Sequence, residues 1–225
     1  MPEATVAAAD DRTGWVSATP VARSPIAVPG PRCVVGRWEV STRRSSAPLR
    51  LVDASPLAKV SIRADVHGAF AAALGVRFRR SRREDGVLTV GSGPGEWLLI
   101  GAPDTAPGLS EQVRALAAGE FVTTVDLTHG RALMRLTGHA AAQALSKVCA
   151  VDLAEATTPD GAAFRSSVAK VTTDVVRDDA GGGGERSYLL HCERSAGQYL
   201  FECLLDAGKE FGVEPAGSDL TGEGV

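Results

Sequence analysis

Apolar residues alternate with polar ones in two separate stretches of the chain, and this spacing predicts two β-strands. Val60 and Ile62 lie two residues apart in the first stretch, and Ala132, Met134 and Leu136 repeat that spacing in the second. A period of two places such side chains on one face of a strand. We therefore expect each strand to present one apolar face to a core.

A short amphipathic helix is predicted after each of these strands, because apolar residues then recur at steps of three and four. The positions are Val66, Phe70 and Leu74 in the first case, and Ala141, Leu145 and Val148 in the second. Each region continues with a glycine-rich turn and an apolar strand that an aromatic residue leads, Trp97 or Tyr188. A second helix is predicted after each of those strands, over 109–119 and 196–212.

The chain therefore contains an internal repeat. The segments "LVDASPLAKVSIRA" (51–64) and "TVDLTHGRALMRLTG" (124–138) share Val-Asp-x-Ser/Thr, a short break and an alternating strand. The later elements follow in the same order in both regions. This order predicts an α+β protein of two similar halves, 48–120 and 121–212, with mostly antiparallel sheets and flanking helices.

The two ends of the chain lack such periodicity. Residues 1–47 contain five prolines and show no sustained apolar period. Segments of that kind do not bury enough apolar surface to fold on their own. We expect a disordered proline-rich extension over 1–47, a folded body over 48–212 and a disordered tail over 213–225.

Composition narrows the class of protein. Of the 225 residues, 44% are hydrophobic and 23% are charged, and the net charge is −3. A weakly acidic chain has no general affinity for nucleic acid or anionic lipid. No apolar run reaches the length of a membrane span. The first residues carry no basic segment, and the four cysteines form no CxxC pair, so we expect a cytoplasmic protein with reduced thiols and no metal site.

Three glycines, Gly91, Gly93 and Gly95, resemble the start of a dinucleotide-binding fingerprint. Such a fingerprint follows a strand and opens a helix, so that helix N–H groups face the phosphates. Here the glycines precede the apolar run 96–100, which predicts a strand, and Pro94 removes a backbone donor. We interpret the glycines as a turn that leads into a core strand.

An arginine-rich segment, "RFRRSRREDG" (77–86), has three interpretations. Its spacing predicts a β-hairpin with a solvated charged face, which is the interpretation we favour. An acidic protein partner is the second. Nucleic acid is the third and is less favoured, because the chain is acidic and only Phe78 supplies an aromatic ring nearby.

Four segments together resemble the gamma subunits of bacterial heterotetrameric sarcosine oxidases, over roughly residues 50–212. They are "LVDASPLAKVSIR", "GPGEWLLIG", "VDLTHGRALMRLTG" and "RSYLLHCERSAGQYLFECLLDAGKEFG". The resemblance implies the tetrahydrofolate-binding fold of the aminomethyltransferase, or T-protein, of the glycine cleavage system.

The resemblance also implies a function. Such complexes oxidatively demethylate sarcosine to glycine and pass the one-carbon unit to tetrahydrofolate. Their FAD, FMN, NAD and zinc belong to the alpha, beta and delta subunits. This chain is then expected to be a non-catalytic small subunit that binds no cofactor itself and packs against the folate-binding half of the alpha subunit. Trp38 and Trp97 are candidates for shielding or interface positions, and an ordinary core position is an equal alternative for Trp97.

One departure from the T-protein leaves an alternative function open. Residues 160–179 replace the acid-rich hairpin that supplies the functional aspartate of the T-protein, and Asp174 is the one acid in the middle of this segment. The alternative is a stand-alone tetrahydrofolate-binding protein or an aminomethyltransferase-like one-carbon transfer enzyme. Its pocket would use Asp126, His129 and Arg165, with the arginine binding the glutamate carboxylate of folate.

Overall fold

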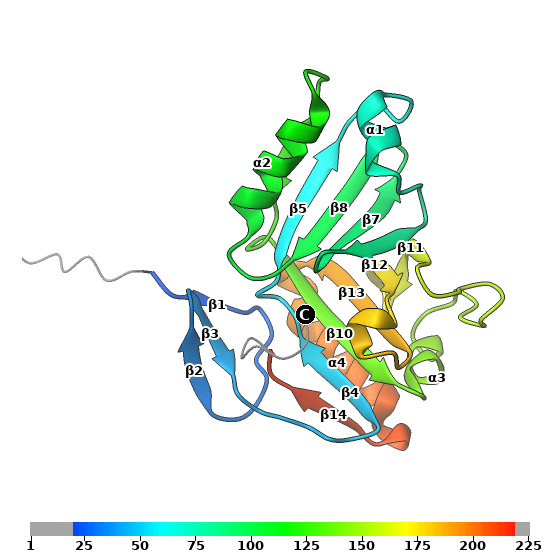
Figure 1. Cartoon of the computed structure of the whole chain (residues 1–225). Coiled ribbons are helices and arrows are strands. Elements are labelled where there is room, and N and C mark those ends of the chain that lie inside the picture. The colour runs from blue at the N-terminus through cyan, green and yellow to red at the C-terminus, as the bar shows by residue number, and fades with distance from the viewer. Residues whose placement is uncertain (1–19, 219–225) are drawn as a thin grey trace, which may run out of the picture.

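The computed structural model describes residues 20–218, which form three β-sheets and four α-helices (Figure 1). The first half contains β4 (Leu49–Asp53), β5 (Ala58–Arg63), α1 (Ala69–Leu74), β6 (Ser81–Glu84), β7 (Val87–Gly93), β8 (Glu96–Gly101) and α2 (Ala106–Ala117). The second half repeats this order with β9 (Thr123–Asp126), β10 (Arg131–Gly138), α3 (Ala141–Ser146), β11 (Ala163–Val168), β12 (Val171–Arg177), β13 (Ser187–Glu193) and α4 (Gly197–Gly208). The predicted α+β class with two similar halves is confirmed.

The two halves exchange their first strands. One sheet has the order β6-β7-β8-β5-β9, and the other has the order β11-β12-β13-β10-β4-β14, where β14 is Val213–Ala216. Strand β4 of the first half therefore pairs with β10, and β9 of the second half pairs with β5, in both cases antiparallel. Although the predicted boundary near residue 120 falls between α2 and β9, neither sheet is built from one half alone.

The two large sheets pack face to face, and the helices cover their outer faces (Figure 1). Strand β8 shows how the alternation builds these layers. Its Trp97 and Leu99 pack toward α1 and α2, whereas Leu98 and Ile100 pack between the sheets. In the second half, α3 and α4 cover the outer face of β10 and β4.

The predicted core positions on the two alternating strands are confirmed. Val60, Ile62, Ala132, Met134 and Leu136 are all fully buried. However, both strands are central in their sheets and are covered on both faces. Of the intervening residues, Lys59 and Leu133 are fully buried as well, whereas Ser61 and Arg135 are half-buried.

The two short helices are shorter than the predicted apolar stripes, and each leaves out one residue of its stripe. Val66 precedes α1 and its side chain is 46% exposed, and Val148 follows the end of α3. The buried members of the stripes are Phe70 in α1, and Ala141 and Leu145 in α3. Each helix therefore contributes about one turn of its stripe to the core.

The prediction of a disordered N-terminal extension is wrong for residues 20–47. This segment forms a three-stranded sheet of order β1-β3-β2, with bounds Ala22–Arg23, Trp38–Ser41 and Arg32–Val35. Ile26 and Val28 of the same segment pack into the core of the second half. The segment is ordered because it packs on the body, and its prolines flank short strands. Residues 1–19 lie outside the described part of the chain.

The predicted disordered C-terminal tail is also wrong where the structure describes it. Strand β14 pairs in parallel with β4 and covers the outer edge of that strand. Beyond β14, the backbone N–H of Gly217 donates to the carbonyl of Arg43, which ties the tail to the N-terminal segment. The pairing partner lies far away in sequence, so local composition did not reveal it. Residues 219–225 are not described.

The glycine-rich stretch leads into a core strand, as predicted, but two of its glycines lie within the preceding strand. Gly91 and Gly93 belong to β7, where the ladder has a bulge, and Gly95 turns into β8 with φ of +70°. A Cβ atom on Gly91 would lie 2.2 Å from the carbonyl oxygen of Arg77. Gly91 is therefore required for a close approach of two backbone segments.

We expect Gly91→Ala to lower the free energy of unfolding by about 1–3 kcal/mol, the usual cost of overpacking. The obstacle is backbone, which has little freedom to move aside. Gly108→Ala is the matched control, because Gly108 lies in α2 with open space around its Cβ position. Alanine is the better helix former, so the control should be stabilised by up to about 1 kcal/mol. Urea unfolding measures both, and equal stabilities of the two variants would contradict the expectation.

Candidate functional site

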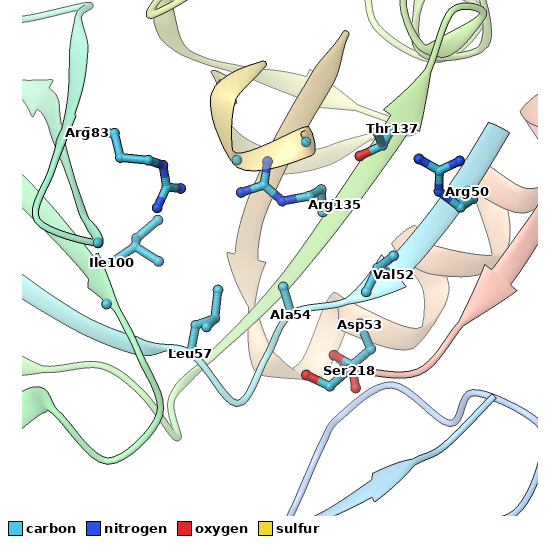
Figure 2. Close-up of a pocket in the computed structure, with 14 residues that line it drawn as sticks. Arg50, Val52, Asp53, Ala54, Leu57, Arg83, Ile100, Arg135, Thr137 and Ser218 are labelled. Carbon is cyan, nitrogen blue, oxygen red and sulfur yellow. The ribbon is translucent and has the colours of Figure 1, made fainter. Parts of the chain in front are cut away.

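A cavity of about 200 Å³ lies where the two large sheets meet (Figure 2). Both halves contribute to it, and β4, β6, β8 and β10 supply most of its side chains. Figure 2 shows Arg83 and Arg135 extending toward each other from different sheets. The lining residues are Arg50, Val52, Asp53, Ala54, Leu57, Arg83, Gly86, Ile100, Gly101, Arg135, Thr137, Gly181, Gly182 and Ser218.

One buried carboxylate, Asp178, holds two arginines of the cavity in place. Arg83 donates from Nε to Oδ1 over 3.2 Å and from Nη2 to Oδ2 over 2.7 Å. Arg135 donates from Nη2 to the same Oδ2 over 2.8 Å, and from Nη1 to the Oγ of Ser187 over 2.9 Å. Because Arg83 lies on β6 and Arg135 on β10, this network joins the two sheets.

The arginines keep Asp178 ionised. Burial alone would raise the pKa of the Asp178 carboxyl, but hydrogen bonds and charge from Arg83 and Arg135 outweigh burial and hold the pKa below its ordinary value. Burial in turn lowers the pKa of Arg135, which Asp178 partly restores. With two cations around one anion, the network carries a net positive charge.

The glycine-rich turn before β13 leaves room for this network. Gly181 belongs to the short helix η1 (Ala180–Gly182). A Cβ atom on Gly181 would lie 2.2 Å from Oδ2 of Asp178 and within 3 Å of both guanidinium groups. The glycine therefore lets the backbone pass directly beside the three charged groups.

A second acid of the cavity, Asp53, lies in a different environment. It is 4% exposed, and its Oδ1 accepts a hydrogen bond from the backbone N–H of Ser55 over 3.0 Å. Burial raises the pKa of Asp53 despite that bond and despite the hydrogen bond from the Ser24 hydroxyl. Asp53 therefore accepts a proton more readily than an exposed aspartate.

Lys59 lies just beyond this acid and is fully buried. Its Nζ donates to the carbonyl oxygens of Ser55 and Leu57, each over 2.7 Å. Burial lowers the pKa of Lys59 to about 7, although the charges of Asp53 and Asp126 oppose that shift. The two carbonyl oxygens satisfy two of the N–H groups of the amine.

The structure places the three predicted folate-site residues away from the cavity lining. The Nε of Arg165 donates to Oδ1 of Asp174 over 2.6 Å, and its Nη2 donates to Oδ2 over 3.1 Å. The ring of His129 stacks on Trp38 with 4.9 Å between the ring centroids. The Oδ1 of Asp126 accepts a hydrogen bond from the backbone N–H of Thr128. A folate pocket formed by Asp126, His129 and Arg165 stays a prediction.

The two tryptophans considered for interface positions are buried within the chain. Trp38 is 1% exposed and Trp97 is 3% exposed. The Nε1 of Trp97 donates to the carbonyl of Val76 over 2.7 Å, and its ring meets Phe70 edge to face. Both rings are core residues, and the expectation of an interface role is wrong for them.

Sequence reasoning missed the cavity residues, although one signal was present. Arg135 interrupts the apolar strand "RALMRLTG", and an arginine in a strand that is buried on both faces requires a partner. Its partner, Asp178, lies in the acidic segment before the glycines and gave no signal of its own. Only the fold brings it beside β6 and β10.

The cavity suits a small anionic group, because guanidinium groups donate to carboxylates and phosphates. Its volume is below the roughly 300–1,000 Å³ of pockets that enclose drug-sized ligands. It therefore encloses only part of a ligand of the size of tetrahydrofolate. Among residues 20–218, no group of three or more His, Cys, Asp or Glu side chains is arranged to hold a metal ion. None of the described helices combines the length and hydropathy needed to span a bilayer.

The sequence is similar to one domain family and to proteins named sarcosine oxidase subunit gamma. The GCVT N-terminal domain family matches residues 88–221. Sarcosine oxidase subunit gamma of Corynebacterium sp. (strain P-1) is 30% identical over 131 residues, which cover 58% of this chain and 61% of that protein. Sarcosine oxidase subunit gamma of an Arthrobacter species is 29% identical over 150 residues, which cover 64% of this chain and 70% of that protein. The resemblance predicted from the sequence is confirmed.

Two solved structures have the same fold. Heterotetrameric sarcosine oxidase from Corynebacterium sp. U-96 contains a chain that matches with a TM-score of 0.63 at 23% identity, covering 77% of this chain and 90% of that one. Aminomethyltransferase T of the glycine cleavage system from Bartonella henselae also matches with a TM-score of 0.63, at 17% identity, covering 84% of this chain and 56% of that one. The predicted aminomethyltransferase-like fold is confirmed.

Proposed function

Since the chain belongs to the GCVT N-terminal domain family, we propose that it is the small, gamma-type subunit of a sarcosine oxidase assembly. The observation that carries the proposal is its similarity to two proteins named sarcosine oxidase subunit gamma. The chain spans 61% of the length of the first of these relatives, so the match covers the greater part of that protein but not all of it.

In the proposed assembly, this chain has a structural role and catalysis takes place on other subunits. The arginines of the central cavity support that role, because Asp178 already engages both Arg83 and Arg135. The ion pairs at the cavity then hold the two sheets together. The proposed partners are the alpha, beta and delta subunits, which would carry the FAD, FMN, NAD and zinc, and the alpha subunit would bind tetrahydrofolate.

Exposed apolar residues around the connection from α2 to β9 also support the role of a subunit. Phe121 in this connection is 88% exposed, Leu116 of α2 is 42% exposed and Val125 of β9 is 50% exposed. Strand β9 is at the edge of its sheet, and its outer edge has no neighbour among the described strands. Such a surface is typical of a region that a partner covers.

The test is co-expression of the tagged full-length chain with the polypeptides encoded beside it. We expect a complex that contains flavin, elutes as one species in size-exclusion chromatography and oxidises sarcosine. Omission of this chain should reduce the yield or stability of the complex without changing its flavin content per remaining subunit.

Calorimetric titration of the isolated chain with tetrahydrofolate tests the alternative of a stand-alone one-carbon enzyme. We expect no heat of binding with a micromolar Kd, since Asp178 already engages both arginines of the cavity. Micromolar binding, together with failure to co-purify with any flavoprotein, would overturn the structural role and favour the alternative. A variant with Asp126→Asn, His129→Ala and Arg165→Ala would then show whether those residues form the site.

A further inference from the structure

The turn between α1 and β6, residues 77–80, presents an unusual set of side chains. We call this segment, with the sequence Arg-Phe-Arg-Arg, the RFRR turn. All four residues are exposed, and the ring of Phe78 is 50% exposed. Among the described residues, no carboxylate forms an ion pair with Arg77, Arg79 or Arg80. Three cations and an aromatic ring are therefore available at one place on the surface.

The RFRR turn is held rigidly. Arg79 has φ of +67°, and its backbone N–H donates to the carbonyl of Gly91 over 2.9 Å. The N–H of Gly91 donates to the carbonyl of Arg80 over 2.8 Å, and the N–H of Ala163 donates to that of Arg79 over 3.0 Å. The turn is thus fixed to β7 on one side and to β11 on the other. A surface that is ordered before binding loses little conformational entropy when a partner docks.

An apolar groove of about 370 Å³ begins beside Phe78. Its wall includes Val66, which is 46% exposed, and the buried residues Val76 and Trp97. Phe78 also lines a smaller apolar hollow, which includes Val90. An apolar side chain of a partner has a place to insert next to Phe78 and Arg77, which both line the groove.

The charges around the RFRR turn indicate the chemistry of the occupant. Nearby arginines outside the turn are neutralised locally, since Arg82 pairs with Glu84, Arg63 with Glu96 and Arg165 with Asp174. The whole chain carries a net charge of −3. The turn is therefore a local excess of positive charge on an acidic protein, which is complementary to an acidic surface.

A protein partner fits these observations better than nucleic acid does. Single-stranded nucleic acid is usually bound by several stacked aromatic rings along a basic groove. Here Phe78 is the one exposed ring of the turn, the ring of Trp97 in the adjoining groove is buried, and Arg77 is the one charged residue among the mostly apolar residues that line the groove. Arginine and aromatic residues beside a hydrophobic pocket are typical of the centre of a protein–protein interface.

We propose that the RFRR turn and its groove dock an acidic segment of a neighbouring subunit, with an apolar side chain of that segment in the groove. This inference rests on the proposed function, because it takes the partner from the same assembly. It adds the surface used and the chemistry of the partner that this surface recognises. Gly91 supports this surface indirectly, because it allows the RFRR turn to lie against β7.

The test is a triple variant, Arg77→Gln/Arg79→Gln/Arg80→Gln, of the full-length chain. Its affinity for the remaining subunits, co-expressed and purified without this chain, is measured by biolayer interferometry at 50 and 300 mM salt. We expect a Kd about tenfold or more weaker than that of the wild type at low salt, together with a smaller dependence on salt. The control variant Arg37→Gln/Arg114→Gln/Lys170→Gln removes the same charge from exposed positions elsewhere and should bind within about twofold of the wild type.

A second variant keeps the test valid if the triple variant folds poorly. Phe78→Ser leaves the charges in place and should weaken binding about tenfold at both salt concentrations, since it removes an apolar anchor. Binding of both variants within twofold of the wild type would overturn the inference while leaving the proposed function intact. Normal assembly of the triple variant with loss of binding to a single-stranded RNA oligonucleotide would overturn it in favour of RNA. Failure of the wild-type chain to bind the other subunits would overturn both proposals.

Discussion

Replacing Asp178 by asparagine is expected to lower the free energy of unfolding by about 3–5 kcal/mol, the usual cost of removing one partner from a buried ionic network. The carboxylate is 3% exposed and holds two guanidinium groups that are 21% and 13% exposed. Asparagine keeps the size of the side chain but not its charge. Arg83 and Arg135 would then remain close together without a counterion.

Urea unfolding at pH 7 measures this loss, and Asp206→Asn is the control. Asp206 pairs with Lys209 on an exposed turn of helix, so its variant should unfold at the wild-type urea concentration. A change of less than about 1 kcal/mol in Asp178→Asn would show that the network contributes little, as for a surface pair.

The difference in stability between the wild type and Asp178→Asn should depend on pH. Because the pKa of Asp178 is lowered in the folded state, its contribution is fully present above the unfolded pKa of about 3.9. The contribution is lost as the pH falls through the lower folded value. The difference in stability between wild type and Asp178→Asn should therefore be constant from pH 5 to 7 and shrink below about pH 4. A difference that grows toward low pH would contradict the assignment.

The second large effect concerns Lys59; it also increases stability as the pH rises, but in a higher pH range. Burial lowers the pKa of Lys59 to about 7, far below the value of about 10.4 for an unfolded chain. Between these values the unfolded state binds more protons than the folded state, so stability rises with pH. Relative to Lys59→Met, the wild type should gain about 2 kcal/mol between pH 7 and 9.

Urea unfolding of the wild type and of Lys59→Met from pH 7 to 9 measures the difference in their free energies of unfolding. The titration of other groups cancels in this difference. Lys147→Met controls for the loss of a lysine charge, because Lys147 lies near the surface and pairs with Glu210. Parallel stability curves of the wild type and Lys59→Met from pH 7 to 9 would show that the buried amine keeps its proton in both states.

Local pattern predicted the elements of this fold well. The residues Val60, Ile62 and Met134 are in the core because a period of two places them on one face of a strand, and that rule holds wherever a strand packs. The repeat between the halves was also visible, since equivalent elements retain similar sequences. The glycines before Trp97 were correctly assigned to a turn that leads into a strand, because a predicted strand and not a helix follows them.

The contacts between distant segments were not predictable from local pattern. The site depends on Asp178 meeting Arg83 and Arg135, which lie on strands of different sheets, and no spacing in the sequence encodes that meeting. The ordered segments at both ends of the chain depend on the same kind of contact. Ile26 and β14 are held by the body, and their own composition resembles that of a disordered chain.

The exchanged strands also constrain the order of events during synthesis. Strand β4 is made early, but Asp53 lies opposite Met134, so β4 has no sheet to join until β10 has left the ribosome. Until then its apolar residues, Leu49 and Leu51, stay without their native partners. Contacts that are distant in sequence form slowly, and unpaired strands of nascent chains are prone to aggregate. Translation that pauses between β4 and β10 should therefore lower the soluble yield more than a pause after Gly138.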